Sequence, residues 1–219
     1  LPVLHRRVGV GNFEFLVNKV RSRLNGWEAK KLSLAGRITL AKSILFSIPN
    51  YFMSTVRIPI IVCGEIEKLA RNFVWGSTSE VRKPALIKYD ECCQLIKIGG
   101  LGLRNLSVQN KLFLLKLDFH LLIKTDDLWV KILRSKYRIC GVLPNSIDRG
   151  NYSYVWRSLM RVWTDVVDNV YWAIGDGTLT NFWNDNWIHQ VGPLRNFSVG
   201  FEEQDDTHRV CDLIDESSN

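Results

Sequence analysis

Apolar side chains recur at helical spacing along most of this 219-residue chain. The periodicity predicts helices over about residues 12–31, 32–48, 59–76, 105–124, 128–137 and 153–170. Polar stretches, or stretches that bear glycine and proline, separate them, notably 77–84 and 139–151. Residues 85–98 fit either a short strand or a turn of helix. The predicted fold class is therefore mainly α.

The pattern changes after residue 170. Aromatic and β-branched residues flank Gly175-Asp176-Gly177, a combination typical of a hairpin turn. We expect antiparallel strands at 171–174 and 179–183, with Trp172 and Trp183 largely buried. The predicted architecture is thus a helical bundle followed by a small α+β subdomain that contains a β-hairpin.

The segment 32–49, LSLAGRITLAKSILFSIP, has two unlike faces on a helical wheel. One face is apolar, as in a helix that packs on a core, and carries Leu34, Ile38, Ala41, Leu45 and Ile48. The opposite face carries only small residues, Gly36, Thr39, Ser43 and Ser47. A stripe that faces solvent more usually carries long charged side chains, so the small stripe indicates that another body approaches this helix closely.

Charge is distributed unevenly and changes sign within the 139–151 linker. Residues 1–140 hold 24 Lys and Arg against 10 Asp and Glu, whereas residues 141–219 hold 5 against 12. We therefore predict a basic helical region at 1–140 and an acidic α+β region at 141–219 that is incomplete at its C-terminus. The basic excess favours a nucleic-acid partner over a role in solubility alone.

The cysteines, the lack of long apolar runs and the first residue indicate the compartment of the protein and the extent of the chain. The five cysteines are odd in number and irregular in spacing, which favours reduced structural thiols in an intracellular protein of the nucleus or cytoplasm. No apolar run reaches the roughly 18 residues of a membrane span, so no membrane partner is expected. The chain begins at Leu1 rather than at a methionine, as expected of a fragment of a longer protein.

The residues show no self-sufficient catalytic or metal site. Asp126-Asp127 precede a predicted helix, and N-capping explains them better than metal binding. Asp205-Asp206 lie in an acidic tail, without the strand context of a two-metal polymerase site. The GGLGLR stretch at 99–104 offers either backbone amides for a phosphate or a tight turn before a helix. Because it lacks the Lys-Ser/Thr ending of a P-loop, the turn is favoured.

Five stretches resemble one protein family. They are NKVRSRLNGWEAKKLSLAGRITLAKSILFSIPNYFMS, EIEKLARNFVWGS, GGLGLRNLSVQNKLFLLKLDFHLL, LWVKILRSKY and GDGTLTNFWNDNW. Their order and spacing together resemble the region after the polymerase palm in plant LINE-type (non-LTR) retrotransposon reverse transcriptases, which are often labelled ribonuclease H proteins. The resemblance extends from about Val3 to Ile214.

The resemblance implies a thumb-like helical bundle and connector from an RNA-directed DNA polymerase. The family's aromatic-Ala-Asp-Asp motif has no counterpart in this chain, so the resemblance carries over no catalytic residue. It implies Mg²⁺ and Zn²⁺ in the full-length protein, but no cofactor in this chain. The implied partners are an RNA/DNA template–primer duplex, the polymerase domains upstream, and the zinc-binding and ribonuclease H regions downstream.

The resemblance also gives one interpretation of the small face at 32–49. In reverse transcriptases a thumb helix lies along the minor groove of the template–primer duplex, which in an RNA–DNA hybrid is wide and shallow. The residues that would face this groove are Gly36, Thr39, Ser43 and Ser47, and those that would contact flanking phosphates are Lys30, Lys31, Arg37 and Lys42. The alternative is close packing of the same face on another helix.

The expected function is therefore non-specific binding of template–primer nucleic acid, without catalysis by this chain alone. The alternative is a catalytically dead retroelement remnant that acts as a helical protein-interaction module.

Overall fold

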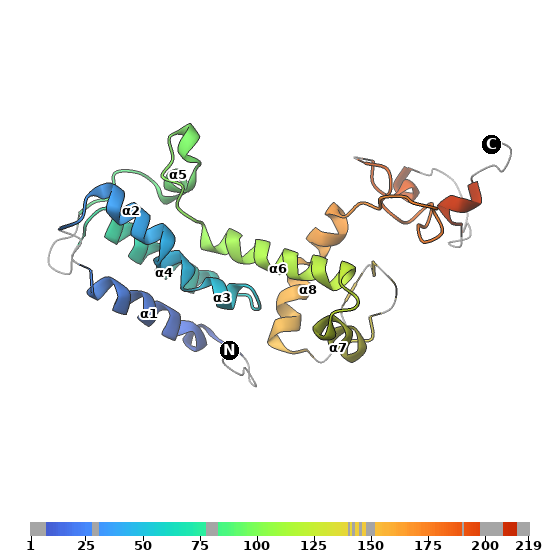
Figure 1. The fold of residues 1–219 in the computed structure, drawn as a ribbon, viewed down its shortest axis with the longest axis horizontal. Coiled ribbons are helices and arrows are strands. Elements are labelled where there is room, and N and C mark those ends of the chain that lie inside the picture. The colour runs from blue at the N-terminus through green and yellow to red at the C-terminus, as the bar shows by residue number, and fades with distance from the viewer. Residues whose placement is uncertain are drawn as a thin grey trace. The chain divides into compact units, whose positions relative to one another are not determined.

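The computed structural model shows helices joined by turns and by longer irregular segments such as residues 170–189 (Figure 1). The residues that it describes are 8–27, 31–77, 83–139, 141, 143–144, 146–147, 152–189, 191–197 and 208–213. The prediction of a mainly α fold is confirmed. The chain divides into two compact units, Leu1–Asp165 and Val166–Asn219, and the division falls inside helix α8 (Tyr154–Asn169). The predicted boundary after residue 140, which rests on charge, remains a prediction.

Three helices of the first unit share one apolar core. Helices α1 (Glu14–Asn25) and α2 (Leu34–Ser43) both pack against α4 (Ile60–Val74), and Figure 1 shows α2 lying along α4. The buried side chains of α4 recur at helical spacing and are Val62, Cys63, Ile66, Ala70, Phe73 and Val74. Because burying one large apolar side chain contributes about 1.5–3 kcal/mol, this stripe holds the three helices together.

The segment that was ambiguous in sequence folds as helix. It forms α5 (Tyr89–Cys93) and the 3-10 turn η4 (Ile96–Ile98). The GGLGLR stretch follows directly and leads into α6 (Leu106–Ile123), which contacts α4 and α7 (Leu128–Lys136). The first unit therefore has no strand in its described part, and α6 connects its α4 core to the helices that follow.

Asn110 of α6 ties down a turn that is distant in sequence. Its side chain is 2% exposed. The side-chain nitrogen donates to the carbonyls of Met53 and Val56, both at 2.9 Å, and the side-chain oxygen accepts from the amide of Ile58 at 2.8 Å. The end of α3 (Asn50–Met53) and the turn that follows it, residues 54–58, thereby obtain partners for their backbone groups, as buried polar groups require.

Local signals mark several helix starts. Ser33 caps α2, because its hydroxyl accepts from the amide of Gly36, and Asn105 caps α6 in the same way through Val108. Asp127 does occupy the N-cap position of α7, as predicted, but its carboxylate makes no cap bond and accepts from the Trp129 indole at 3.3 Å instead.

The predicted helix over 32–48 is divided. Helix α2 ends at Ser43, a 3-10 turn follows at Leu45–Ser47, and α3 begins at Asn50. Pro49 explains the break, because it has no amide to donate to the Leu45 carbonyl and its ring clashes with that carbonyl in a continuous α-helix. The chain tightens into 3-10 geometry before the proline instead.

The predicted β-hairpin is wrong. In the described part of the second unit, 171–174 and 179–183 form no paired strands, and an isolated antiparallel bridge joins Asn181 to Arg209. Amides that a hairpin would use have other partners. The Asn181 amide donates to the Asp185 carboxylate, the Asn181 side chain accepts from the Trp183 and Asn184 amides, and the Phe182 amide donates to the His208 carbonyl. Asn and Asp side chains compete with a ladder in this way. Trp172 and Trp183 are only partly buried.

No described helix combines the length and the apolar character that a membrane crossing requires. Four cysteines carry free thiols, Cys63, Cys92, Cys93 and Cys211, and Cys140 lies outside the described residues. Burial raises the pKa of Cys63 to about 12 and that of Cys93 to about 11. Both thiols are therefore protonated at neutral pH, which fits the predicted structural role and not nucleophilic chemistry.

Candidate nucleic-acid interface

The small side chains of α2 and the turn after it lie at the surface. Thr39, Ser43 and Ser47 are all exposed. Each hydroxyl donates to a backbone carbonyl of its own segment: Thr39 to Ala35 at 3.0 Å, Ser43 to Thr39 at 2.8 Å, and Ser47 to Ile44 at 2.7 Å. Within the described part of the chain no helix covers this face, which is smooth because its hydroxyls fold back on the backbone.

Gly36 belongs to the start of the helix more than to its open face. It is half-buried, and its amide donates to the Ser33 hydroxyl at 3.2 Å. A Cβ at this position would lie 3.5 Å from the same hydroxyl, an ordinary contact. The space around Gly36 therefore does not itself require glycine.

Arg37 lies between helices. It is half-buried, its Nε atom has no hydrogen-bond partner, and its guanidinium lies against Gly76, which has a φ of 71°. Gly76 follows the C-terminus of α4, where a cation is stabilised by the partial negative charge of the helix end. Arg37 therefore links α2 to α4 in addition to any contact with a ligand.

Lys42 extends from α2 to the GGLGLR turn. Its Nζ lies 3.1 Å from the position that a Cβ of Gly102 would occupy, and Gly102 has a φ of 61°. Lys42 is half-buried and lies on the same helix as the exposed Thr39 and Ser43. The structure thus brings one cation beside the small face, at the edge that borders the turn.

The GGLGLR turn has a structural explanation. The amides of Leu101 and Leu103 donate to the Cys92 carbonyl at 3.2 and 3.0 Å, and that of Gly102 donates to the Gln94 carbonyl at 2.9 Å. These amides are consumed within the turn and are not directed at a phosphate. The interpretation as a tight turn before α6 is the one that the hydrogen bonds support.

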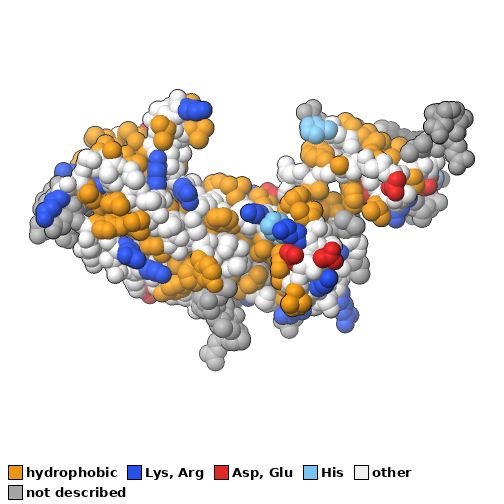
Figure 2. Space-filling model, in the orientation of Figure 1, with side chains coloured by type: hydrophobic (Ala, Val, Ile, Leu, Met, Phe, Trp, Pro, Cys, Tyr) orange, Lys and Arg blue, Asp and Glu red, His pale blue; other side chains and the backbone are white. Residues whose placement is uncertain are grey.

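For two further predicted phosphate contacts, Lys30 and Lys31, the structure shows little about their position. Lys31 is exposed, and Lys30 lies outside the described residues. Figure 2 shows that the visible face of the first unit carries Lys and Arg side chains among mostly uncharged ones around α2. The visible surface around α2 therefore carries scattered positive charges and not a continuous basic patch.

In the part of the chain that the structure describes, no carboxylates come together for metal chemistry. Among the described residues no group of three His, Cys, Asp or Glu side chains could hold a metal ion. Asp126 lies 3.6 Å from the Lys131 ammonium, and its neighbour Asp127 bonds to an indole, so this pair has local partners. Asp205 and Asp206 lie outside the described residues.

Sequence analysis missed three arginines that line one pocket of the first unit, namely Arg57, Arg157 and Arg161. The spacing of Arg157 and Arg161 places both on one face of α8, a signal that the sequence does contain. Their meeting with Arg57, which lies about a hundred residues earlier, depends on tertiary packing and leaves no local pattern.

Two proteins of the plant Arabidopsis thaliana are similar to this chain. A protein of Arabidopsis thaliana named "Putative ribonuclease H protein" is 38% identical over 218 residues, which make up 98% of this chain and 34% of that protein. Both proteins are thus alike over the whole of this chain, which spans about a third of the relative's length. These findings support a retroelement-related protein.

A second protein of Arabidopsis thaliana, named "Uncharacterized mitochondrial protein", is 29% identical over 149 residues, covering 68% of this chain and 97% of its own length. No family model matches the chain, and no solved structure matches it. The retroelement relationship therefore rests on these two sequence similarities, and a polymerase thumb is a finer assignment.

Proposed function

We propose that this chain is the thumb and connector part of a retroelement RNA-directed DNA polymerase of the LINE type, and that it binds template–primer nucleic acid without catalysing alone. The observation that carries the proposal is the exposed, smooth face of Thr39, Ser43 and Ser47 with Lys42 beside it. The 38% identity to the ribonuclease H protein supports the class of protein. The catalytic Mg²⁺ and the structural Zn²⁺ of such a polymerase would be bound by regions outside this chain.

The chemistry of the face suits a hybrid minor groove. Each of the three hydroxyls uses its hydrogen within its own segment, so its oxygen can accept a hydrogen bond from a ribose 2′-hydroxyl. The 2′-hydroxyl lines the shallow minor groove of an A-form-like duplex. Lys42 would contact a phosphate at the edge of that groove. Such contacts depend on shape and backbone charge, so binding would be independent of base sequence.

The replacement Ser43→Leu tests whether the small face of α2 contacts the minor groove of the duplex. Ser43 is exposed, so we expect an unchanged melting temperature but an affinity for a labelled RNA–DNA hybrid that is lower by about fivefold, or roughly 1 kcal/mol. Fluorescence anisotropy measures the affinity. Ser22→Leu, the same change at an exposed position of α1, is the matched control and should leave the affinity unchanged.

The replacement Lys42→Ala tests the charge. If the complex neutralises about four phosphates, the log–log dependence of affinity on salt has a slope of roughly −3 to −4. Lys42→Ala should bring that slope closer to zero by up to about one unit and weaken binding to every sequence equally. Lys19→Ala removes one exposed lysine from α1 and should leave the slope unchanged. Equal effects of Lys42→Ala and Lys19→Ala would contradict the proposal.

The alternative function, a helical protein-interaction module, is favoured by a different surface. Leu86, Leu95, Ile96 and Ile98 around α5 and η4 are between 67% and 81% exposed. Apolar groups gathered in this way are typical of protein contacts. This alternative predicts a chain that has no measurable hybrid affinity, so the same titration separates the two functions.

A further inference from the structure

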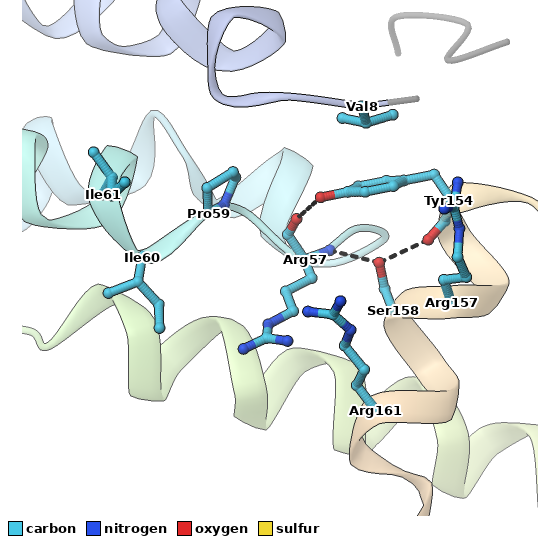
Figure 3. Close-up of a pocket in the computed structure, with 9 residues that line it drawn as sticks. All are labelled: Val8, Arg57, Pro59, Ile60, Ile61, Tyr154, Arg157, Ser158 and Arg161. Carbon is cyan, nitrogen blue, oxygen red and sulfur yellow. Dashed lines mark hydrogen bonds between the residues drawn. The ribbon is translucent and has the colours of Figure 1, made fainter. Parts of the chain in front are cut away.

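A pocket of the first unit gathers three cations around a surface hollow of about 550 Å³ (Figure 3). Arg57 lies in the turn before α4, and Arg157 and Arg161 lie on successive turns of α8. Figure 3 shows the side chains of Arg57 and Arg161 extending toward one another from these two elements. None of the three arginines forms an ion pair with a carboxylate of the described residues.

A closed set of hydrogen bonds holds the pocket in shape. The Tyr154 hydroxyl donates to the Arg57 carbonyl at 2.6 Å, and the Arg57 amide donates to the Ser158 hydroxyl at 3.0 Å. The Ser158 hydroxyl in turn donates to the Tyr154 carbonyl at 2.8 Å. Because Asn110 also fixes the preceding turn, the backbone that carries Arg57 is set before any ligand arrives, which lowers the entropic cost of binding.

All three arginines lie close enough to the Tyr154 hydroxyl to affect its pKa. Burial raises the pKa of the Tyr154 hydroxyl, whereas Arg161, Arg57 and Arg157 each act to lower it. Three guanidinium groups without a carboxylate repel one another unless an anion lies among them. The planar guanidinium is the side chain best suited to bind a phosphate through two parallel hydrogen bonds.

The opposite wall of the pocket is apolar. It is formed by Val8, Pro59, Ile60 and Ile61, and the two isoleucines are 64% and 63% exposed. A phosphate alone would leave this wall bare. A nucleotide unit of a nucleic-acid strand has both parts, with the phosphate beside the arginines and the sugar and base against the apolar side chains.

We propose that this pocket binds one phosphate of a nucleic-acid strand, with the adjoining nucleoside packed on Pro59, Ile60 and Ile61. The site goes beyond the groove contact proposed for α2, because it recognises a single strand and uses different elements. It is therefore independent of whether α2 faces a duplex.

The test uses the full chain and a labelled 12-nucleotide DNA strand. The double replacement Arg57→Gln and Arg161→Gln should weaken binding about tenfold and bring the salt slope closer to zero by about 0.7, the value for one phosphate of a single strand. The single replacement Arg161→Gln changes an exposed side chain and should give a smaller loss without loss of fold. Arg23→Gln, at an exposed arginine of α1, is the matched control and should have no effect.

Two further arms separate the sources of phosphate and the two proposals. Calorimetric titration with pyrophosphate should show weaker binding than the strand. Pyrophosphate that binds at least as tightly as the strand would overturn the strand assignment. Ser43→Leu should leave single-strand affinity unchanged. If that replacement lowers hybrid affinity while the arginine variants bind the single strand normally, the pocket proposal fails and the groove proposal stands. If instead the arginine variants weaken single-strand binding while Ser43→Leu leaves hybrid affinity unchanged, the groove proposal fails and the pocket proposal stands.

Discussion

At the scale of the residue, Asp118 stands out in the described core because burying its carboxyl group without a hydrogen-bond partner costs free energy. It is 0% exposed, and neither carboxylate oxygen has a hydrogen-bond partner. Burial raises its pKa from 3.8 to about 8. Between about pH 4 and pH 8 the folded state therefore keeps a proton on Asp118 that the unfolded state has released.

The proton held by Asp118 makes the free energy of unfolding depend on pH. Between about pH 4 and pH 8 the folded chain holds more protons than the unfolded chain, so the free energy of unfolding should fall as pH rises, by at most about 1.4 kcal/mol per pH unit. Asp118→Asn should flatten this dependence and stabilise the protein at pH 8. Chemical denaturation at several pH values measures both effects, and an equally steep fall in the variant would contradict the assignment.

Single residues also mark the limit of sequence analysis. The small face of Thr39, Ser43 and Ser47 is visible in the periodicity, and its exposure agrees with the pattern. The location of Arg37 against Gly76 and the buried state of Asp118 were not predictable, because both depend on which helices meet. The pocket lined by Arg57, Arg157 and Arg161 was not predicted for the same reason.

At the scale of the element, two glycines have opposite roles in α4 and in the turn before α6. Gly64 lies inside α4, is exposed, and has open space around its missing Cβ. At Gly100 a Cβ would collide with the Gln94 carbonyl, which is backbone and cannot swing aside. The same chemical change should therefore stabilise one element and disrupt the other.

We expect Gly64→Ala to stabilise the chain by roughly 0.5–1 kcal/mol, because alanine loses less conformational entropy in a helix. Gly100→Ala should destabilise it by roughly 1–3 kcal/mol through overpacking. Urea denaturation of both variants at one pH gives the comparison. Destabilisation by both would show that α4 does not tolerate a side chain at its exposed glycine.

Elements were predictable where a strong apolar period coincided with a local start or stop signal. The long helices after Pro59 and Asn105 follow this rule. The hairpin failed because Asn181 and Asp185 bond to backbone amides that the strands needed, a competition that turn composition alone does not reveal. The helix over 32–48 was overextended because apolar spacing continues through the break that Pro49 imposes.

At the scale of the whole molecule, charge and compactness divide the chain differently. The basic excess ends near residue 140, but the first compact unit continues to Asp165. Arg157 and Arg161 therefore come from the stretch that is acidic in sequence, and fold with the basic unit. A protein cut at residue 140 would lose two of the three pocket arginines, so nucleic-acid binding is best measured on the full chain.

The bonds of Asn110 have a consequence for the order of assembly. The Ile58 amide has its partner on a helix 52 residues further along, so it is protected from solvent only when α6 is docked. Its hydrogen–deuterium exchange rate therefore reports the docking of α6, separately from the formation of α4. Asn110→Ala should speed exchange at Ile58 far more than at amides in the middle of α4, as measured by NMR. Uniform acceleration would mean instead that α6 and α4 open as one cooperative unit.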